Sequence, residues 1–441
     1  MDAAPPRGVV GLLTAQAFAF GVTLALLLVP ANSLFLDAYG SQWLPVTYIA
    51  TAVVGGTAAA LIARAARRTR LIRVATAGLG AFAALFAVSW AILAAGGEWV
   101  SGVLLVAFSI LIQIGFVFIG GQAGRLLDVR QMKALFPRVV SGFAVGFFAG
   151  GVIQIPLLAL FGSTENLLLA TTAAQLTFLV LLLYTERRFP EVRAEQAAGA
   201  PAVARPPLRT LFTGLLALLL AYQVLSAMGS QVVDFLLFDR AGARYSGGDL
   251  TRFLSLYTAL LNLVDIVFLA VLAGPLMRRF GLRLGLTLNP ATVAVILAVM
   301  AVVAGGAGVA SLGVFALAGL LRIADLTTTD GTTRTSINAA YQVVDEDDRL
   351  AVQAVVEGIG VPVAIGVTGV LLLGLQALDL GVGAVIAFGL GIPKIGIARL
   401  ASNGAYGVGR VNVTVASSTF ATSLTRSVRN PAIYGIFVAS N

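Results

Sequence analysis

Residues 99–122 read WVSGVLLVAFSILIQIGFVFIGGQ, a stretch without a single charged side chain. A helix of about 20 apolar residues crosses the hydrocarbon core of a bilayer, so this stretch predicts a transmembrane helix. The whole chain has a similar character, because 59% of its residues are hydrophobic and only 11% are charged. Soluble domains carry about 25% charged residues. The sequence therefore predicts an all-α, polytopic membrane protein.

Comparable apolar stretches recur about twelve times along the chain, at 9–30, 43–63, 74–95, 99–122, 139–161, 166–185, 210–233, 252–274, 283–304, 308–323, 351–374 and 377–392. A segment that is first charged and then rich in Ala and Pro separates the first six from the last six. We therefore expect two six-helix bundles. The expected parts are an N-terminal bundle (1–185), a cytoplasmic linker (186–209), a C-terminal bundle (210–392) and a basic polar tail (393–441).

Lysine and arginine are concentrated in every second loop between the apolar stretches. Cytoplasmic loops carry an excess of these residues, so we expect both termini in the cytoplasm of a cell inner membrane or plasma membrane. The loop at 240–252 is an exception, because it is basic although it falls on the opposite side. The basic residues of the expected cytoplasmic side include Arg64, Arg67, Arg68, Arg125, Arg130, Lys133, Arg187, Arg188, Arg278, Arg279, Arg322 and Arg334.

Composition excludes several kinds of chemistry. The chain has no cysteine and no histidine, which removes thiol nucleophiles, haem ligation, Ser-His-Asp triads and the usual zinc sites. The loop carboxylates Asp325 and Asp330 do not form a convincing paired metal motif, so an integral-membrane transferase ranks last among the hypotheses. The net charge of +9 is spread over short loops, which disfavours nucleic acid as a partner. We expect no enzyme activity, metal or cofactor.

Asp265 is the most informative charged residue, because it lies midway along 252–274 among apolar neighbours. A charge in mid-bilayer costs roughly 2.5–3.5 kcal/mol on insertion scales and usually has a function. Asn262 lies three residues earlier, on the same helical face. One interpretation is a carboxylate that lines the substrate or coupling-ion pathway and binds H+ or Na+. The alternative is a carboxylate that packs against a neighbouring helix.

Other polar residues within the apolar stretches extend this candidate pathway. Asp234 and Gln231 lie late in 210–233, or just after it, near the expected outer boundary. Glutamine side chains in membrane helices can hydrogen-bond a nucleobase or sugar, although more often they join neighbouring helices. The further candidates of this kind are Gln223, Gln113 and Gln154.

Charged residues near the cytoplasmic ends of the helices predict a gate. Asp325 and Glu357 fall there, where pairing with Arg322 or Arg334 could hold the cytoplasmic face closed. The complete expected gate consists of Arg125, Asp128, Arg130, Arg322, Asp325, Arg334 and Glu357.

Residues 274–283, GPLMRRFGLR, resemble the cytoplasmic loop motif of the major facilitator superfamily. That motif runs Gly-x-Leu-x-Asp-Arg-x-Gly-x-Arg/Lys between the eighth and ninth helices, and Arg278 here occupies its Asp position. The resemblance implies a transporter fold of two six-helix bundles, with the substrate site between them near the midplane. The resembling residues lie between the eighth and ninth apolar stretches, which is where the motif of that superfamily lies.

Two further segments resemble the ATP/ADP antiporter (nucleotide transporter) family. They are LDVRQMKALFPR at 127–138 and the region 322–358, which contains RIAD and AYQVV. This resemblance implies a nucleotide substrate. Exchangers of that family use lysines within the membrane, whereas Lys133 and Lys394 are the only lysines here and neither lies in an apolar stretch. We also expect no arginine within the core of a span, which favours a weakly charged or neutral relative of the nucleotides.

The leading hypothesis is a secondary transporter that works by alternating access, with nucleotides or related anions as candidate substrates. Its expected partners are the lipid bilayer, a small-molecule substrate and a coupling H+ or Na+. The alternative is a non-transporting membrane domain of the same fold that senses or anchors. The lack of lysine in the apolar stretches supports this alternative.

Overall fold

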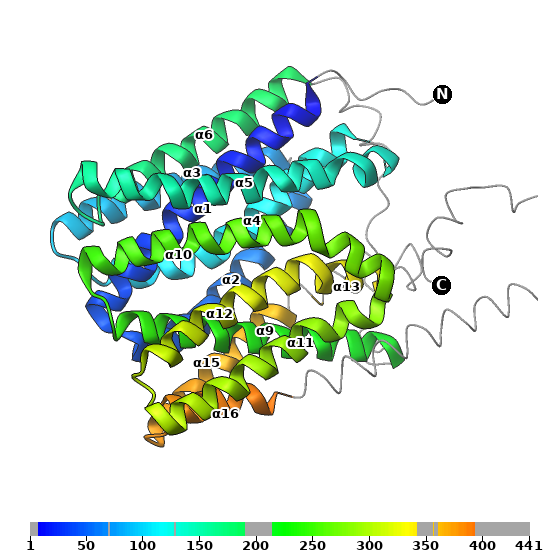
Figure 1. Ribbon diagram of the computed structural model, residues 1–441. Coiled ribbons are helices and arrows are strands. Elements are labelled where there is room, and N and C mark those ends of the chain that lie inside the picture. The colour runs from blue at the N-terminus through cyan, green and yellow to red at the C-terminus, as the bar shows by residue number, and fades with distance from the viewer. Residues whose placement is uncertain are drawn as a thin grey trace, which may run out of the picture. The chain divides into compact units, whose positions relative to one another are not determined.

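The computed structural model describes residues 8–68, 71–127, 129–189, 214–341, 356 and 360–392 (Figure 1). Every regular element in these ranges is helical. The gaps contain Asp128, Glu357, most of the predicted linker and the predicted tail, which therefore lie outside the described residues. The division of the chain at the linker accordingly stays a prediction.

Each of the twelve predicted spans overlaps a helix. The helices are α1 (Val9–Tyr39), α2 (Leu44–Arg68), α3 (Leu71–Ala94), α4 (Val100–Leu126), α5 (Val129–Phe161), α6 (Leu167–Arg188), α9 (Gly214–Gly242), α10 (Gly247–Val267), α11 (Gly274–Ala307), α12 (Leu312–Thr328), α13 (Arg334–Tyr341), α15 (Val361–Ala377) and α16 (Val382–Gly391). A 3-10 turn, η1 (Ser41–Trp43), precedes α2, and two π-helical segments, η2 (Phe268–Ala273) and η3 (Thr329–Thr333), follow α10 and α12. Within the described ranges, nine helical segments are long and apolar enough to cross a membrane.

The structure divides into two compact units. Unit 1 takes its described residues from Met1–Ala202, Phe238–Ile266 and Gly369–Leu373. Unit 2 takes them from Val203–Leu237, Val267–Thr368 and Gly374–Asn441. Unit 1 thus contains α1–α6 and nearly all of α10, and unit 2 contains most of α9 together with α11–α13 and α16.

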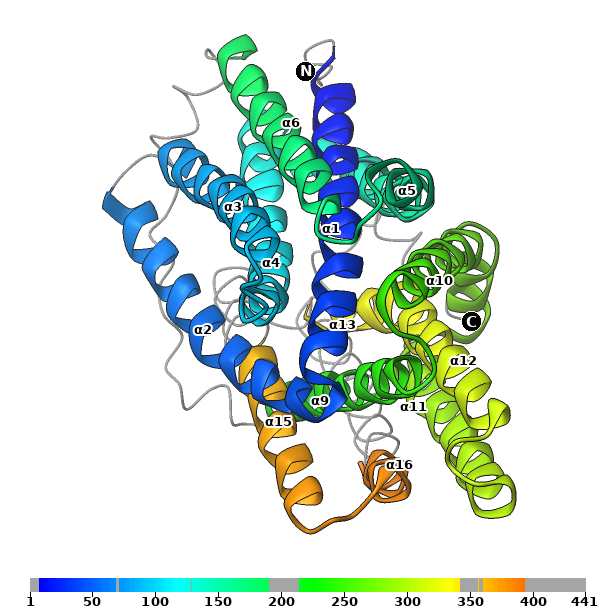
Figure 2. The same cartoon turned by 90° about the vertical axis from the view of Figure 1, so that its left-hand side faces the viewer.

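Helix α1 is the centre of unit 1, where it packs against α4, α5 and α6 (Figure 2). Phe20 of α1 is fully buried, and its ring centroid lies 5.1 Å from that of Phe178 and 5.6 Å from that of Phe143. The backbones of α1 and α5 approach so closely that a Cβ atom at Gly146 would lie 2.1 Å from the Phe18 carbonyl oxygen. Small residues allow this kind of contact between membrane helices.

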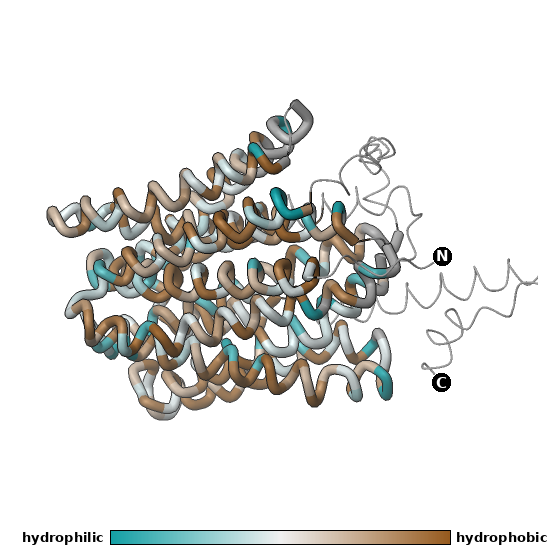
Figure 3. The backbone as a smooth tube through the Cα atoms, turned by 90° about the horizontal axis from the view of Figure 1, so that it is seen from above, coloured by the Kyte–Doolittle hydropathy of each residue, from teal (hydrophilic) through white to brown (hydrophobic). Residues whose placement is uncertain are grey.

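Large apolar side chains are exposed on many of the helices, as a lipid environment requires. Figure 3 shows that hydrophobic residues recur along the length of the helices. Exposed examples are Leu160, Val180, Val299 and Val302. A soluble protein would place charged residues at such positions. The length, composition and exposed apolar surface of the helices together define a multi-pass membrane protein.

The loop motif at 274–283 marks a real change of direction. One apolar helical span runs from Gly247 to Gly281 and the next from Arg283 to Ala307. Gly281 joins them with a φ of 62° and a ψ of −159°. Glycine adopts this conformation readily, whereas a Cβ atom strains it. The motif therefore separates the eighth and ninth spans, as its resemblance to the major facilitator loop implies.

The expected end of the tenth span at 323 was wrong, because the apolar helical span continues from Leu312 to Asn338. Its second half looks polar in sequence, since it contains TTTDGTTRTS at 327–336. Threonine hydroxyls can donate hydrogen bonds to backbone carbonyls of the preceding turn, so a threonine-rich segment can remain helical within an apolar environment. Thr328 donates to the Ala324 carbonyl at 2.6 Å, and Thr332 donates to the Thr328 carbonyl at 2.8 Å.

Candidate functional site

Three charged side chains meet inside the membrane spans of unit 2. Asp234 comes from α9, whereas Arg322 and Asp325 come from successive turns of α12. Arg322 Nε lies 2.7 Å from Asp234 Oδ1, and Arg322 Nη1 lies 3.6 Å from Asp325 Oδ2. We call Asp234, Arg322 and Asp325 the charged triad.

The charged triad lies deep within its spans. Arg322 is about 15 Å along the helix axis from Leu312, where its span begins, at 1.5 Å per residue. Asp234 is about 12 Å from Gly242, where its own span ends. A hydrocarbon core is about 30 Å thick, so these positions are far from either end of a spanning helix. The expectation that no arginine lies within the core of a span was therefore wrong. It was wrong because the tenth span was expected to end at 323, directly after Arg322.

The three side chains differ in exposure. Asp325 is only 1% exposed, whereas Asp234 is 21% and Arg322 is 23% exposed. Among the described residues, Arg322 is the only cation that pairs with either carboxylate. Two carboxylates and one guanidinium give the triad a formal charge of −1 when all three are ionised.

Asn289 of α11 joins the charged triad through its side-chain amide. Its Nδ2 lies 2.9 Å from Asp325 Oδ1 and 3.0 Å from the hydroxyl oxygens of Thr328 and Thr329. The side chain is fully buried, and its Oδ1 atom has no hydrogen-bond partner among the described residues. The sequence does not indicate Asn289 as a site residue, because one asparagine in an apolar helix carries no sign of what it faces.

Polar contacts also link the helices around the triad. The buried hydroxyl of Tyr222 on α9 donates to the Leu286 carbonyl of α11 at 3.0 Å. Thr333 of η3 donates to the Gly285 carbonyl, also on α11, at 3.1 Å. These bonds connect α9, α11 and η3 close to the charged triad, so its carboxylates are held in a polar setting inside an apolar bundle.

The pathway candidates Asp265 and Asn262 lie together on α10 and are both buried. The Asn262 amide donates to the Thr258 carbonyl at 2.8 Å. Both residues belong to unit 1, whereas the charged triad belongs to unit 2. Gln231 and Gln223 are half-buried on α9. The roles of these four residues stay predictions.

Gln154 is fully buried on α5, where it connects three helices. Its amide nitrogen donates to the Ala25 carbonyl of α1, and its oxygen accepts from the Ser255 hydroxyl of α10 at 2.9 Å. One turn earlier on α10, the Thr251 hydroxyl lies 2.6 Å from that of Ser33. Gln113 lies on α4, and its side chain is outside the described residues.

The gate candidates fall into separate places. Arg125 of α4 forms a bidentate ion pair with Glu186 of α6, with nitrogen–oxygen distances of 3.1 and 3.3 Å. Arg334 is mostly exposed and pairs with Asp330, one turn earlier, at 3.2 Å. Arg322 and Asp325 belong to the charged triad. Asp128, Glu357 and the Arg130 side chain lie outside the described residues, so a shared gate stays a prediction.

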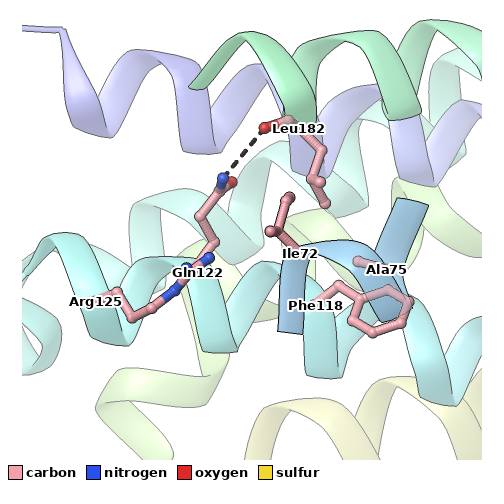
Figure 4. A pocket seen from close by; sticks show the side chains of 6 residues that line it. All are labelled: Ile72, Ala75, Phe118, Gln122, Arg125 and Leu182. Atoms are coloured by element: carbon pink, nitrogen blue, oxygen red, sulfur yellow. Dashed lines mark hydrogen bonds between the residues drawn. The ribbon is translucent and has the colours of Figure 1, made fainter. Parts of the chain in front are cut away.

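A small pocket in unit 1 lies beside Arg125 (Figure 4). Its lining residues are Ile72, Ala75, Phe118, Gln122, Arg125 and Leu182. Gln122 donates to the Leu182 carbonyl at 3.2 Å, and its own oxygen has no partner among the described residues. The cavity measures about 10 Å³, which is room for about one water molecule. It is too small for an organic substrate.

Solved structures with the same fold are transporters. The chain matches a structure of the nucleoside transporter NupG with a TM-score of 0.61 and 12% identity, over 92% of this chain and 99% of that one. It matches a POT family transporter in complex with a thioalcohol-conjugated peptide with a TM-score of 0.62 and 14% identity, over 91% and 97%. It also matches a D-xylose-proton symporter with a TM-score of 0.56 and 13% identity, over 91% and 96%.

These likenesses establish the fold class. The chain is a polytopic membrane protein with a major facilitator-like fold, as its hydropathy and its loop motif predict. Neither the family models nor the curated protein sequences include a match. At identities of 12–14%, the structural matches identify the fold alone.

Proposed function

We propose that this protein is a secondary transporter that moves a small molecule across a membrane by alternating access. The observation that carries the proposal is the charged triad, which places an arginine and two aspartates inside membrane spans. Ionisable residues at that depth are expensive to insert and mark substrate or ion pathways in membrane proteins. A domain that only anchors or senses has no evident need for them.

The fold supports the same proposal. The matched structures are of a nucleoside transporter, a peptide-bound transporter and a sugar–proton symporter, and all of these carry small molecules. Major facilitator-like bundles place their substrate sites near the midplane of the bilayer, where charged residues have a use. Both the fold and the buried charged residues therefore favour transport over an anchoring or sensing role.

Charge narrows the substrate class. The resemblance to the ATP/ADP antiporter family favours nucleotides or related anions. A triphosphate in a low-dielectric pathway requires compensating positive charge. The formal charge of the triad is instead −1, because Arg322 is shared by two carboxylates. We therefore propose a nucleoside or another weakly charged relative of the nucleotides as the first substrate to test.

Uptake into proteoliposomes tests this proposal. Purified protein would be reconstituted and offered labelled adenosine, uridine, AMP, ADP and ATP in parallel, under imposed proton and sodium gradients. We expect saturable uptake that favours the nucleosides. Rapid ATP/ADP exchange would contradict the charge argument while supporting transport, and an absence of uptake by correctly folded protein would favour the anchoring alternative.

Two arginine variants make the test specific to the triad. Arg322→Gln removes the cation shared by Asp234 and Asp325, and we expect at least a tenfold loss of uptake. Arg252→Gln is the matched control, because Arg252 is 65% exposed and pairs only loosely, at 3.8 Å, with Asp249. An equal loss of uptake in both variants would show that the charged triad has no specific role in transport.

A further inference from the structure

We propose that one end of the α3–α6 helix pair binds the headgroup of an anionic phospholipid. The residues concerned are Arg73 of α3 together with Arg187 and Arg188 of α6, all within unit 1. We call these three residues the basic patch. The proposal goes beyond the proposed function and does not depend on it, because a membrane protein can bind a lipid whether or not it transports a substrate.

Helices α3 and α6 pack side by side and run antiparallel (Figure 2). The Gln175 amide of α6 donates to the Leu79 carbonyl of α3 at 3.1 Å. Further along, the Trp90 indole of α3 donates to Asn166, directly before α6, at 2.9 Å. Residue numbers thus rise along α3 while they fall along α6. The start of α3 and the end of α6 therefore lie at the same end of the helix pair.

The basic patch lies where the two membrane spans end. The span of α3 begins one residue before Arg73, and the span of α6 ends at Arg188. Counted along the helix axes from the Gln175 hydrogen bond, Arg73 lies about 9 Å and Arg187 about 18 Å away. Arg73 is thus nearer the hydrocarbon, where a long arginine side chain extends toward the interface. All three guanidinium groups can therefore reach the depth of the lipid phosphates.

The positive charge of the basic patch is not balanced by carboxylates. All three arginines are exposed, and none of them pairs with a carboxylate among the described residues. The neighbouring carboxylate, Glu186, pairs instead with Arg125 at 3.1 Å. The Arg188 guanidinium lies 5.9 Å from the ring centroid of Phe189, a contact that leaves its charge in place. The basic patch therefore attracts an anion.

An exposed apolar stripe leads from the basic patch toward the middle of α6. Leu176, Val180 and Tyr184 are spaced four residues apart, so they lie on one face of the helix. Arg188 continues the same spacing and ends the stripe. The three side chains are 46%, 61% and 52% exposed. Tyrosine is enriched at membrane–water interfaces, so Tyr184 marks the transition from acyl chains to headgroups.

An anionic phospholipid matches the basic patch and the stripe together. Such a lipid joins a phosphate to acyl chains, and α6 presents arginine and apolar surface in the same order. Arginine binds phosphate oxygens through charge-assisted hydrogen bonds, often in pairs. Basic clusters beside membrane helices attract the anionic lipids of the cytoplasmic leaflet, which is the side where we expect this end of α6. A soluble phosphate would use the arginines and leave the stripe without a role.

Lipid titration of the purified protein tests the proposal. Phosphatidylglycerol and phosphatidylcholine with identical acyl chains would be added in detergent, and binding followed by native mass spectrometry. We expect phosphatidylglycerol to bind at least tenfold more tightly. An arginine near an anionic membrane surface strengthens binding about fivefold, so Arg187→Gln/Arg188→Gln should raise the Kd for phosphatidylglycerol about 25-fold. Arg187→Lys/Arg188→Lys should keep most of the affinity, because it keeps both charges.

Arg244→Gln/Arg252→Gln is the matched control, since it removes two exposed arginines near the connection between α9 and α10 and changes the net charge equally. Its affinity for phosphatidylglycerol should equal that of the wild type. Equal losses in the two glutamine double variants would reduce the effect to net charge and overturn the proposal. Equal binding of both lipids by the wild type would also overturn it. So would inorganic phosphate that displaces phosphatidylglycerol at millimolar concentration, because the ligand would then be a soluble anion.

Fluorescence quenching locates the bound lipid. Tyr184→Trp adds a fluorophore beside the basic patch, and Leu160→Trp adds one on α5, where Leu160 is 76% exposed. Acyl-brominated phosphatidylglycerol should quench the first fluorophore at concentrations about tenfold lower than brominated phosphatidylcholine. The second fluorophore should be quenched equally by both lipids. Failure of the Tyr184→Trp signal to distinguish the lipids, in protein with a wild-type thermal midpoint, would place the lipid elsewhere and overturn the proposal.

Discussion

At the scale of single residues, the protein depends on charges that its spans bury. Arg322 holds two carboxylates, and one of them, Asp325, is almost completely buried. The removal of one member of a buried ion pair leaves an uncompensated charge, which destabilises proteins by about 3–5 kcal/mol. Exposed ion pairs contribute much less to stability, roughly 0–1 kcal/mol.

Arg322→Gln should therefore destabilise the folded protein by about 3 kcal/mol or more. The control Arg252→Gln removes an exposed arginine and should change stability by less than about 1 kcal/mol. Thermal unfolding in detergent, followed by fluorescence, measures both. The double variant Arg322→Gln/Asp234→Asn should recover part of the loss, because it also removes one of the two carboxylates. Equal midpoints for the two single variants would show that the triad has no structural role.

Asp265 provides a second residue-scale prediction. It is buried on α10 together with Asn262. If Asp265 belongs to the substrate or ion pathway, Asp265→Asn should abolish uptake while the protein remains folded, because the amide keeps the shape and loses the charge. Uptake and the thermal midpoint, measured on the same preparation, decide between the two interpretations. Loss of stable protein would support the packing role.

At the scale of helices, each of the twelve stretches predicted from hydropathy overlaps a described helix, because a bilayer-crossing helix requires about 20 apolar residues. Nine helical segments in the described ranges are long and apolar enough to cross a membrane. The end of α12 was harder to predict. Residues 327–336 read as polar, yet hydroxyls such as that of Thr328 bond to carbonyls of their own helix. The charged triad could not be predicted for two reasons. The early end expected for the tenth span placed Arg322 at a helix end, and no local sequence pattern links Arg322 to Asp234 or Asn289.

The α1–α5 contact gives a prediction at this scale. Gly146→Ala should destabilise the protein by about 1–3 kcal/mol, because the added Cβ atom would lie 2.1 Å from the Phe18 carbonyl oxygen and the helices would have to separate. Gly120→Ala on α4 is the control, since no atom lies within 4 Å of its added Cβ atom. That change should be neutral or stabilising by up to about 1 kcal/mol. Thermal midpoints of the two variants should move in opposite directions or differ clearly, and a matching shift would contradict the close packing.

At the scale of the whole molecule, the fold defines a membrane protein but leaves its orientation to the distribution of charge. Arginine-rich loops are expected in the cytoplasm, with both termini on that side. Consecutive loops alternate between the two sides of the membrane, because each span carries the chain across the bilayer once. Two exposed positions on either side of an odd number of spans therefore test the orientation of that part of the chain.

Glu98 and Arg187 form such a pair, since Glu98 lies between α3 and α4, Arg187 lies at the end of α6, and both are exposed. The chain has no native cysteine, so Glu98→Cys and Arg187→Cys each introduce a single thiol. A membrane-impermeant maleimide added to intact cells should label Glu98→Cys, because its loop is expected outside. Arg187→Cys should react only after the membrane is permeabilised, because the positive-inside rule places the basic end of α6 in the cytoplasm. Labelling of Arg187→Cys alone in intact cells would reverse the orientation, and labelling of both would contradict an odd number of spans between the two positions.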